Sequence, residues 1–131
     1  MSQENVEVVR RCCEAFADDE ETWLQALDPD LVWYPIEDAH VPARGIDGAK
    51  GVRQRWLDAW EEHSAALAVE DLSGAGENVV CTLHVSGRGR GSGVEVNLQV
   101  YPHYKVRDGR IVYAFEYPDR ASALEAAGVR E

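Results

Sequence analysis

Basic residues, cysteines and long apolar runs are all scarce in this chain of 131 residues. Lysine and arginine total 13 against 24 aspartates and glutamates, so the formal net charge is −11. A surface this acidic repels phosphate backbones and anionic lipids, which argues against nucleic-acid and membrane partners. The apolar runs are far too short to cross a bilayer, and the first residues lack the basic-then-apolar layout of a signal peptide. We therefore expect a cytoplasmic protein.

Motifs for metals and common cofactors are also missing. The three cysteines, Cys12, Cys13 and Cys81, have no metal-ligand spacing. Cys12 and Cys13 are neighbours on an expected helix, where their side chains diverge by about 100° and cannot easily form a disulfide. The sequence contains no phosphate-binding loop, nucleophile elbow or dinucleotide fingerprint. We therefore predict small core thiols in a reducing compartment, no metal and no cofactor.

The residues that are present change their hydrophobic period halfway along the chain. Apolar residues in the first half recur at the 3-to-4-residue spacing of amphipathic helices, and polar residues that can cap a helix precede each stretch. Helices are expected from Ser2, from Asp18-Asp19 as far as Leu27 before Asp28-Pro29, from Asp47 as far as His63, and from Asp119 to Gly128.

Strand-like alternation with period 2 dominates the second half. Val96, Leu98 and Val100 share one face of a long expected strand, which a sheet with one covered face requires. Asp108-Gly109 between two such runs is a strong signal for a type I′ hairpin. Strands are expected at 31–36, 66–72, 78–86, 94–107 and 110–117. This order predicts one α+β domain over residues 1–131, with helices packed on one face of a curved antiparallel sheet.

Four segments resemble those of SnoaL-like domains in the nuclear-transport-factor-2-like superfamily. They are SQENVEVVRRCCEAF, LDPDLVWYP, ARGIDGAKGVRQRW and RDGRIVYAFEYPDRASALEAAGV. The resemblance implies a cystatin-like α+β barrel, in which a cone-shaped antiparallel sheet wraps around N-terminal helices. It also implies a pocket for one small apolar molecule and a homodimer formed through the outer sheet face. Members include isomerases, epoxide hydrolases, polyketide cyclases and non-catalytic proteins, so the fold does not fix the reaction.

Two branches of this superfamily can be compared by residue. The ketosteroid isomerase branch has an aspartate base where this chain has Tyr34, and an oxyanion-binding tyrosine closest to Cys12 here, so standard isomerase chemistry is not expected. The limonene epoxide hydrolase branch has an arginine and two aspartates at positions that resemble Thr82, His84 and Glu116. That triad is not intact, but His84 and Glu116 remain as a candidate acid–base pair in the pocket.

Further binding residues are predicted from the faces that the expected helices and strands turn toward the pocket. We predict that Trp33, Tyr34, Trp56, Trp60, Thr82, Leu98 and Val100 contact the substrate, although aromatic residues at helical spacing also occur as plain core. If Glu116 faces inward, the alternating Tyr113 and Phe115 face outward and need a cover, which a homodimer would provide. Two functions remain open: a cofactor-free hydrolase, cyclase or isomerase acting on a small apolar substrate, or a non-catalytic dimeric ligand-binding module.

Overall fold

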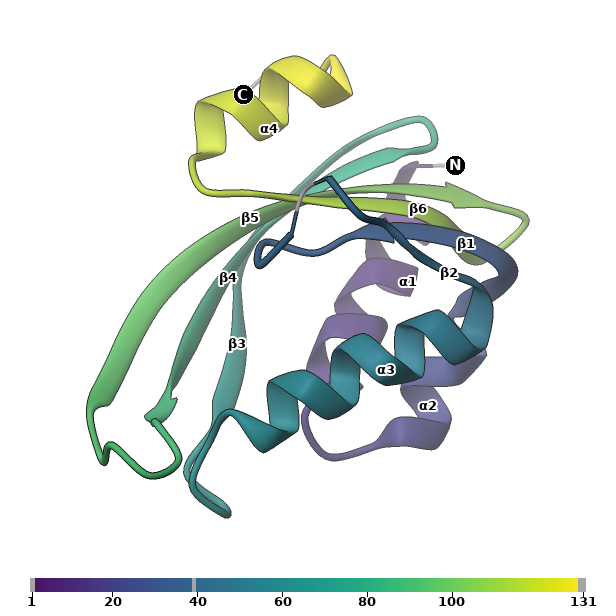
Figure 1. The fold of residues 1–131 in the computed structure, drawn as a ribbon. Helices are drawn as coiled ribbons and strands as arrows, with labels where there is room; N and C mark the ends of the chain where they lie inside the picture. Colours follow the sequence, from purple (N-terminus) through teal and green to yellow (C-terminus); the bar gives the residue numbers. More distant parts are fainter. Residues whose placement is uncertain (1, 39, 130–131) are drawn as a thin grey trace.

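The computed structural model of the protein describes residues 2–38 and 40–129. Three helices lie on one side of a strongly curved sheet, and a fourth helix lies on the other side (Figure 1). The expected α+β class with a curved sheet is confirmed. In chain order the elements are α1 (Ser2–Ala15), α2 (Glu20–Gln25), β1 (Leu27–Tyr34), β2 (Ala43–Arg44), α3 (Gly45–Asp58), β3 (Ala66–Ala75), β4 (Asn78–Arg88), β5 (Glu95–Arg107), β6 (Arg110–Tyr117) and α4 (Arg120–Ala127).

The sheet is mixed and open at both edges. Its six strands follow the order β2-β1-β6-β5-β4-β3, so β2 and β3 are the edge strands. All neighbours pair antiparallel except β1 and β6, which run parallel and bring Trp33 opposite Ala114. The parallel pairing was not expected from the sequence. It places the end of the first strand next to the last strand, and the pocket carboxylate described below comes from that last strand.

Two helices begin at the side-chain caps that the sequence predicts. The Asp19 carboxylate accepts a hydrogen bond from the Thr22 amide at the start of α2, and Asp119 does the same for Ser122 at the start of α4. Gly128 ends α4 in the left-handed conformation, with φ +67°. None of the helices among the described residues is long and apolar enough to cross a membrane.

The expected bounds of α2 and α3 were wrong. Leu27 belongs to β1 instead of α2, because the Ala26 carbonyl already accepts a hydrogen bond from Ile111 of β6. Arg44, which pairs with Val32 in the sheet, is the N-cap of α3, so the chain enters the helix directly from a strand and Asp47 lies inside it. The α3 helix ends at Asp58 and does not reach His63.

The two faces of the sheet pack against different helices. Alternate residues of β4, such as Cys81 and Leu83, join the main core under α1, α2 and α3. Val80, on the opposite face, packs against Ala123 and Ala127 of α4. The concave face therefore encloses the interior, and the outer face is partly covered by the C-terminal helix. The β5–β6 hairpin turns at Asp108-Gly109, whose φ angles of +53° and +77° are those of the predicted type I′ turn.

Candidate functional site

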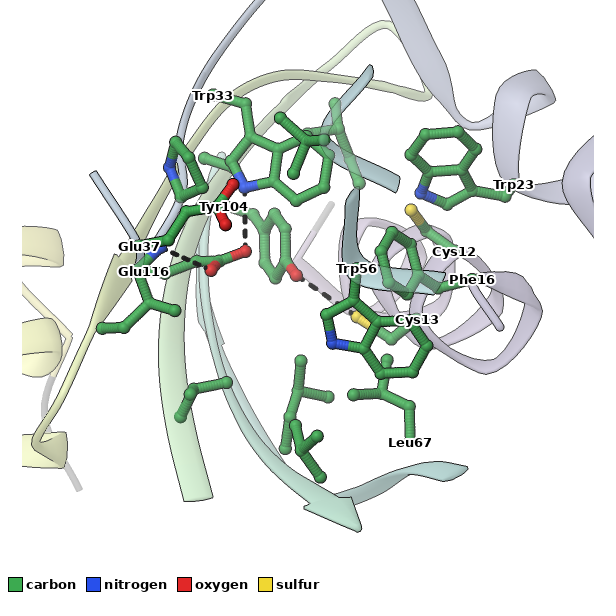
Figure 2. Close-up of a pocket in the computed structure, with 18 of the residues that line it drawn as sticks. Cys12, Cys13, Phe16, Trp23, Trp33, Glu37, Trp56, Leu67, Tyr104 and Glu116 are labelled. Atoms are coloured by element: carbon green, nitrogen blue, oxygen red, sulfur yellow. Dashed lines mark hydrogen bonds between the residues drawn. The ribbon is translucent and has the colours of Figure 1, made fainter. Parts of the chain in front are cut away.

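A cavity of about 240 Å³ lies between the concave face of the sheet and helices α1, α2 and α3 (Figure 2). The lining is almost entirely apolar and includes side chains from every strand except the short β2. Two lining residues, Ile36 and Leu98, are 45% and 44% exposed, so they mark where the cavity meets solvent. This space suits a small molecule of roughly ten non-hydrogen atoms.

Aromatic rings form one wall of the cavity. Phe16, directly after α1, makes edge-to-face contacts with Trp23, Trp33 and Trp56, with ring centroids 5.5, 6.1 and 5.1 Å apart. Trp60 extends the wall, with its ring centroid 5.7 Å from that of Trp56. Such contacts hold the rings in fixed orientations and give the wall a defined shape. Of the predicted substrate-binding residues, the structure places Trp33, Trp56, Trp60, Leu98 and Val100 along this cavity.

Glu116 supplies the carboxylate of the pocket. It lies on the concave face of β6, opposite Pro102 of β5. One carboxylate oxygen accepts a hydrogen bond from Trp33 Nε1 and the other from the Ile36 amide, each at 2.8 Å (Figure 2). Both oxygens are therefore fixed in position, and each keeps further acceptor capacity for a ligand.

The pKa of Glu116 is raised above its ordinary value, because the apolar surroundings disfavour the charged carboxylate. The hydrogen bonds from Ile36 and Trp33 act in the opposite direction and only partly offset this effect. A carboxyl group with a raised pKa in an apolar pocket is suited to accept a proton and to return it.

His84, Thr82 and Tyr34 do not line the pocket, so their predicted placement there was wrong. Leu83 and Val85 of β4 line the cavity, and the intervening His84 points to the outer face, where it pairs with Gln99 of β5. Thr82 lies on that same outer face of β4. The apolar side chains of β4, such as Leu83 and Val85, are buried in the interior. A shift of one residue in the register of the strand would turn them toward solvent, so the alternate residues His84 and Thr82 face outward.

Tyr34 is the third misplaced residue. It stacks on Phe115 across the outer face of β1 and β6, with ring centroids 5.2 Å apart. Its neighbour Trp33 takes the inward position on β1.

Few charged groups reach the cavity. Among the described residues that line it, Glu37 and Glu116 carry the only formal charges, and no Arg, Lys, His or Asp is present. Glu37 lies at the rim, where its carboxylate is 3.1 Å from the Arg55 guanidinium of α3. Glu116 therefore has no cationic partner among these lining residues.

A phenol hydroxyl group also reaches the cavity, and it was not predicted from the sequence. Tyr104 of β5 lines the cavity, and its hydroxyl oxygen lies 3.4 Å from Sγ of Cys13. Burial raises the pKa of Tyr104, so the phenol stays neutral. The expected strand face that contains Leu98 and Val100 also contains Tyr104, so the alternation carried a signal for it.

The buried thiols of Cys12 and Cys81 remain protonated. Burial raises the pKa of Cys12, and the hydrogen bond with Cys13 together with burial raises that of Cys81. Only the thiolate is an effective nucleophile, so these cysteines are unsuited to covalent catalysis. They fill space as the small core residues expected from the sequence.

Comparisons with known proteins agree with this architecture. The SnoaL-like domain family matches residues 9–114. A protein assigned as a SnoaL-like polyketide cyclase from Jannaschia sp. CCS1 has a TM-score of 0.77 and 18% identity, over 99% of this chain and 95% of its own. A loop-truncation variant of IdmH has a TM-score of 0.73 and 25% identity, over 92% and 97%.

An epoxide hydrolase from M. tuberculosis that is similar to limonene epoxide hydrolase has a TM-score of 0.68 and 18% identity, over 96% of this chain and 90% of its own. A structure described as a cystatin fold protein also matches, with a TM-score of 0.71. No curated protein matches the sequence. The family match covers most of the chain, and the fold and the interior cavity accord with it. The chain belongs to the SnoaL-like domain family.

Proposed function

We propose that this protein is a cofactor-free enzyme of the isomerase or cyclase type, in which Glu116 moves a proton to and from a carbon atom of a small apolar substrate. The observation that carries the proposal is the Glu116 carboxylate, held by two N–H donors inside an otherwise apolar cavity. Proton transfer needs one group of suitable pKa at a fixed position, and the pocket supplies that.

Hydrolysis is less well supported by the lining of the pocket. Activation of a water molecule is easiest where a base and a cationic or second acidic group hold the water between them. Among the described lining residues, Glu116 has no such partner, and Glu37 lies at the rim in contact with Arg55. His84, the partner expected from the sequence, is on the other face of the sheet. The chemistry that remains is proton transfer by a single carboxyl group.

The first experiment measures proton exchange at carbon. Menthone, a monocyclic ketone with ten carbon atoms, is a suitable probe, because its size fits the cavity and the hydrogen atoms beside its carbonyl are weakly acidic. In D₂O, we expect the protein to accelerate deuteration and epimerisation at these carbons above the buffer rate, as followed by NMR. Binding of menthone without acceleration would favour the alternative function, a ligand-binding module.

That alternative rests on a specific observation. Both carboxylate oxygens of Glu116 already accept hydrogen bonds from Trp33 and Ile36, an arrangement that also serves a group that only orients a ligand. Native mass spectrometry of the purified protein would identify a co-purifying ligand under either function. The exchange experiment separates the two, because only the enzyme changes the rate at carbon.

The outer face of the sheet supports a second proposal, a homodimer. An outer aromatic surface across β1 and β6 consists of Tyr34, Tyr113 and Phe115. The centroid of the Tyr34 ring lies 6.1 Å from that of Tyr113 and 5.2 Å from that of Phe115. The α4 helix packs beside Tyr117 and leaves this surface without a helix above it. Aromatic residues on a sheet face are a common core of subunit interfaces. We therefore expect a second copy of the chain to cover it.

Phe115→Arg should convert the dimer into a monomer. The new guanidinium would lie in the centre of the outer aromatic surface, where an unpaired charge is costly to bury. In sedimentation velocity, the wild type should sediment as a dimer and the variant as a monomer. Val94→Arg is the control, because Val94 is 59% exposed in the β4–β5 connection. A monomeric wild type, or a dimeric Phe115→Arg, would contradict this interface.

A further inference from the structure

The indole N–H of Trp60 is a hydrogen-bond donor that the protein leaves unused. Trp60 is 9% exposed and lines the cavity. Among the buried side-chain nitrogen and oxygen atoms of the described residues, only Trp60 Nε1 and His103 Nδ1 have no hydrogen-bond partner. His103 lies on the outer face, where its ring contacts that of Tyr113. A buried donor without a partner destabilises a fold, so the unpaired N–H on the cavity wall calls for a reason.

Trp60 and Glu116 lie toward opposite ends of the cavity. A Cβ atom at Gly87 of β4 would be 2.7 Å from Cε3 of Trp60, so the indole rests directly on the strand at this glycine. Gly87 pairs with Val96 of β5, whereas Glu116 pairs with Pro102 of the same strand. These two β5 positions are roughly 20 Å apart along an extended strand. A ligand that fills the cavity therefore has one end near Trp60 and the other near Glu116.

The strand residues around the Trp60 end of the cavity are apolar. Leu67, Val85 and Leu98 occupy paired positions on β3, β4 and β5 and line the cavity there. None of their side chains can donate a hydrogen bond. Nε1 lies on the opposite side of the indole from Cε3, the atom nearest to Gly87, and no hydrogen bond fixes the ring. A small rotation about χ2, a soft torsion in tryptophan, can turn the N–H toward an oxygen atom in the cavity.

We propose that Trp60 Nε1 binds a hydrogen-bond-accepting oxygen of the substrate at the end of the cavity opposite Glu116. The substrate class is then a small, mostly apolar molecule with an ether, ester or carbonyl oxygen remote from the carbon atom on which Glu116 acts. This inference rests on the proposed function for the carbon atom at Glu116, but the hydrogen bond to Trp60 does not need proton transfer. A ligand oxygen pairs the free donor, and it thereby fixes which end of the ligand faces Glu116.

Two ligands of equal size test this selection. Pentyl methyl ether and heptane are linear chains with the same number of non-hydrogen atoms, and the ether has an oxygen atom in place of one methylene group. Headspace gas chromatography measures the free concentration of each volatile ligand, and hence its affinity for the protein. Trp60→Phe should lower the ratio of ether affinity to heptane affinity by roughly tenfold. The ratio cancels the loss of ring contacts, which affects both ligands alike.

Trp56→Phe is the matched control for this substitution. Trp56 belongs to the same aromatic wall, with its ring centroid 5.7 Å from that of Trp60, but its N–H is not among the buried unpaired atoms of the described residues. The affinity ratio should stay within about twofold of the wild-type value. An equal change of the ratio in both variants, or a change in Trp56→Phe alone, would contradict the role of Trp60.

NMR of the wild-type protein detects the hydrogen bond itself. The ¹H–¹⁵N signal of the Trp60 indole can be assigned through the contact of its ring with Gly87. Its proton should move downfield on addition of pentyl methyl ether and much less with heptane, because a hydrogen bond deshields the proton. No shift, or equal shifts with both ligands, would overturn the inference.

The result at Trp60 is separable from the proposed catalysis. If the indole signal and the affinity ratio change as expected but the wild type does not accelerate deuteration of menthone, the catalysis fails and the binding role of Trp60 stands. Acceleration of deuteration without the indole shift would leave the catalysis in place and exclude the role of Trp60.

Discussion

Glu116→Gln should reduce proton exchange at carbon by about 10²–10⁴-fold, the usual contribution of a general acid–base group. Glutamine keeps the shape of the side chain but cannot accept a proton at the pH of the assay. Menthone affinity should therefore fall by only a few fold, while the exchange rate approaches that of the buffer. The raised pKa of Glu116 also fixes the pH profile: the rate should rise with pH as the carboxyl loses its proton, with a midpoint above the ordinary glutamate value.

The glutamine substitution has a structural cost that must be separated from the catalytic one. Its amide oxygen can accept from either Trp33 or Ile36, but its NH₂ group must then face the other donor. Loss of one such hydrogen bond costs on the order of 1 kcal/mol of folding free energy, which thermal unfolding would measure. Glu37→Gln is the matched control, because Glu37 lines the same cavity at its rim. Equal loss of exchange in both variants would contradict the role of Glu116.

Leu83→Trp should weaken ligand binding and leave the protein folded. Leu83 points from β4 into the cavity, so an indole at this position occupies the space that the ligand needs. Displacing such a side chain costs about 1–3 kcal/mol, which corresponds to menthone binding weaker by roughly 5- to 150-fold. The free energy of unfolding should change by less than about 1.5 kcal/mol, because the added bulk fills empty volume and tryptophan suits a strand.

His84→Trp is the matched control for this substitution. It adds an indole to the next residue of the same strand, but on the outer face, where Gln99 is the cross-strand neighbour. Menthone affinity should stay within about twofold of the wild-type value. The pair of variants thus tests both the cavity and the register of β4. Weaker binding in His84→Trp than in Leu83→Trp would contradict the assignment of faces.

The fold was predictable because several local signals agreed with one another. The caps at Asp19 and Asp119, the left-handed Gly128 and the Asp108-Gly109 turn lie where the sequence placed them. The parallel pairing of β1 with β6 was not predictable. It joins segments more than eighty residues apart, such as Trp33 and Ala114, and nothing in either segment specifies its partner.

The site was only partly predictable, and the reason lies in β4. Cys81, Leu83 and Val85 form the apolar set of this strand, and burial of that set directs His84 outward. The family comparison favoured the opposite orientation for His84, and the local apolar pattern was the better guide. Tyr104 was missed for a related reason. The alternation along β5 marks its face as apolar, and the pattern contains no signal for the hydroxyl group.

The protonation of Glu116 is the central claim, and the indole N–H of Trp33 reports on it directly. This N–H donates to a Glu116 oxygen at 2.8 Å, so its ¹H–¹⁵N NMR signal should shift as the carboxyl titrates. Trp33→Phe identifies the signal among those of the four tryptophans. We predict a titration midpoint above the ordinary value of 4.5, and no such transition in Glu116→Gln. A midpoint at or below 4.5, or an unchanged transition in Glu116→Gln, would contradict the account.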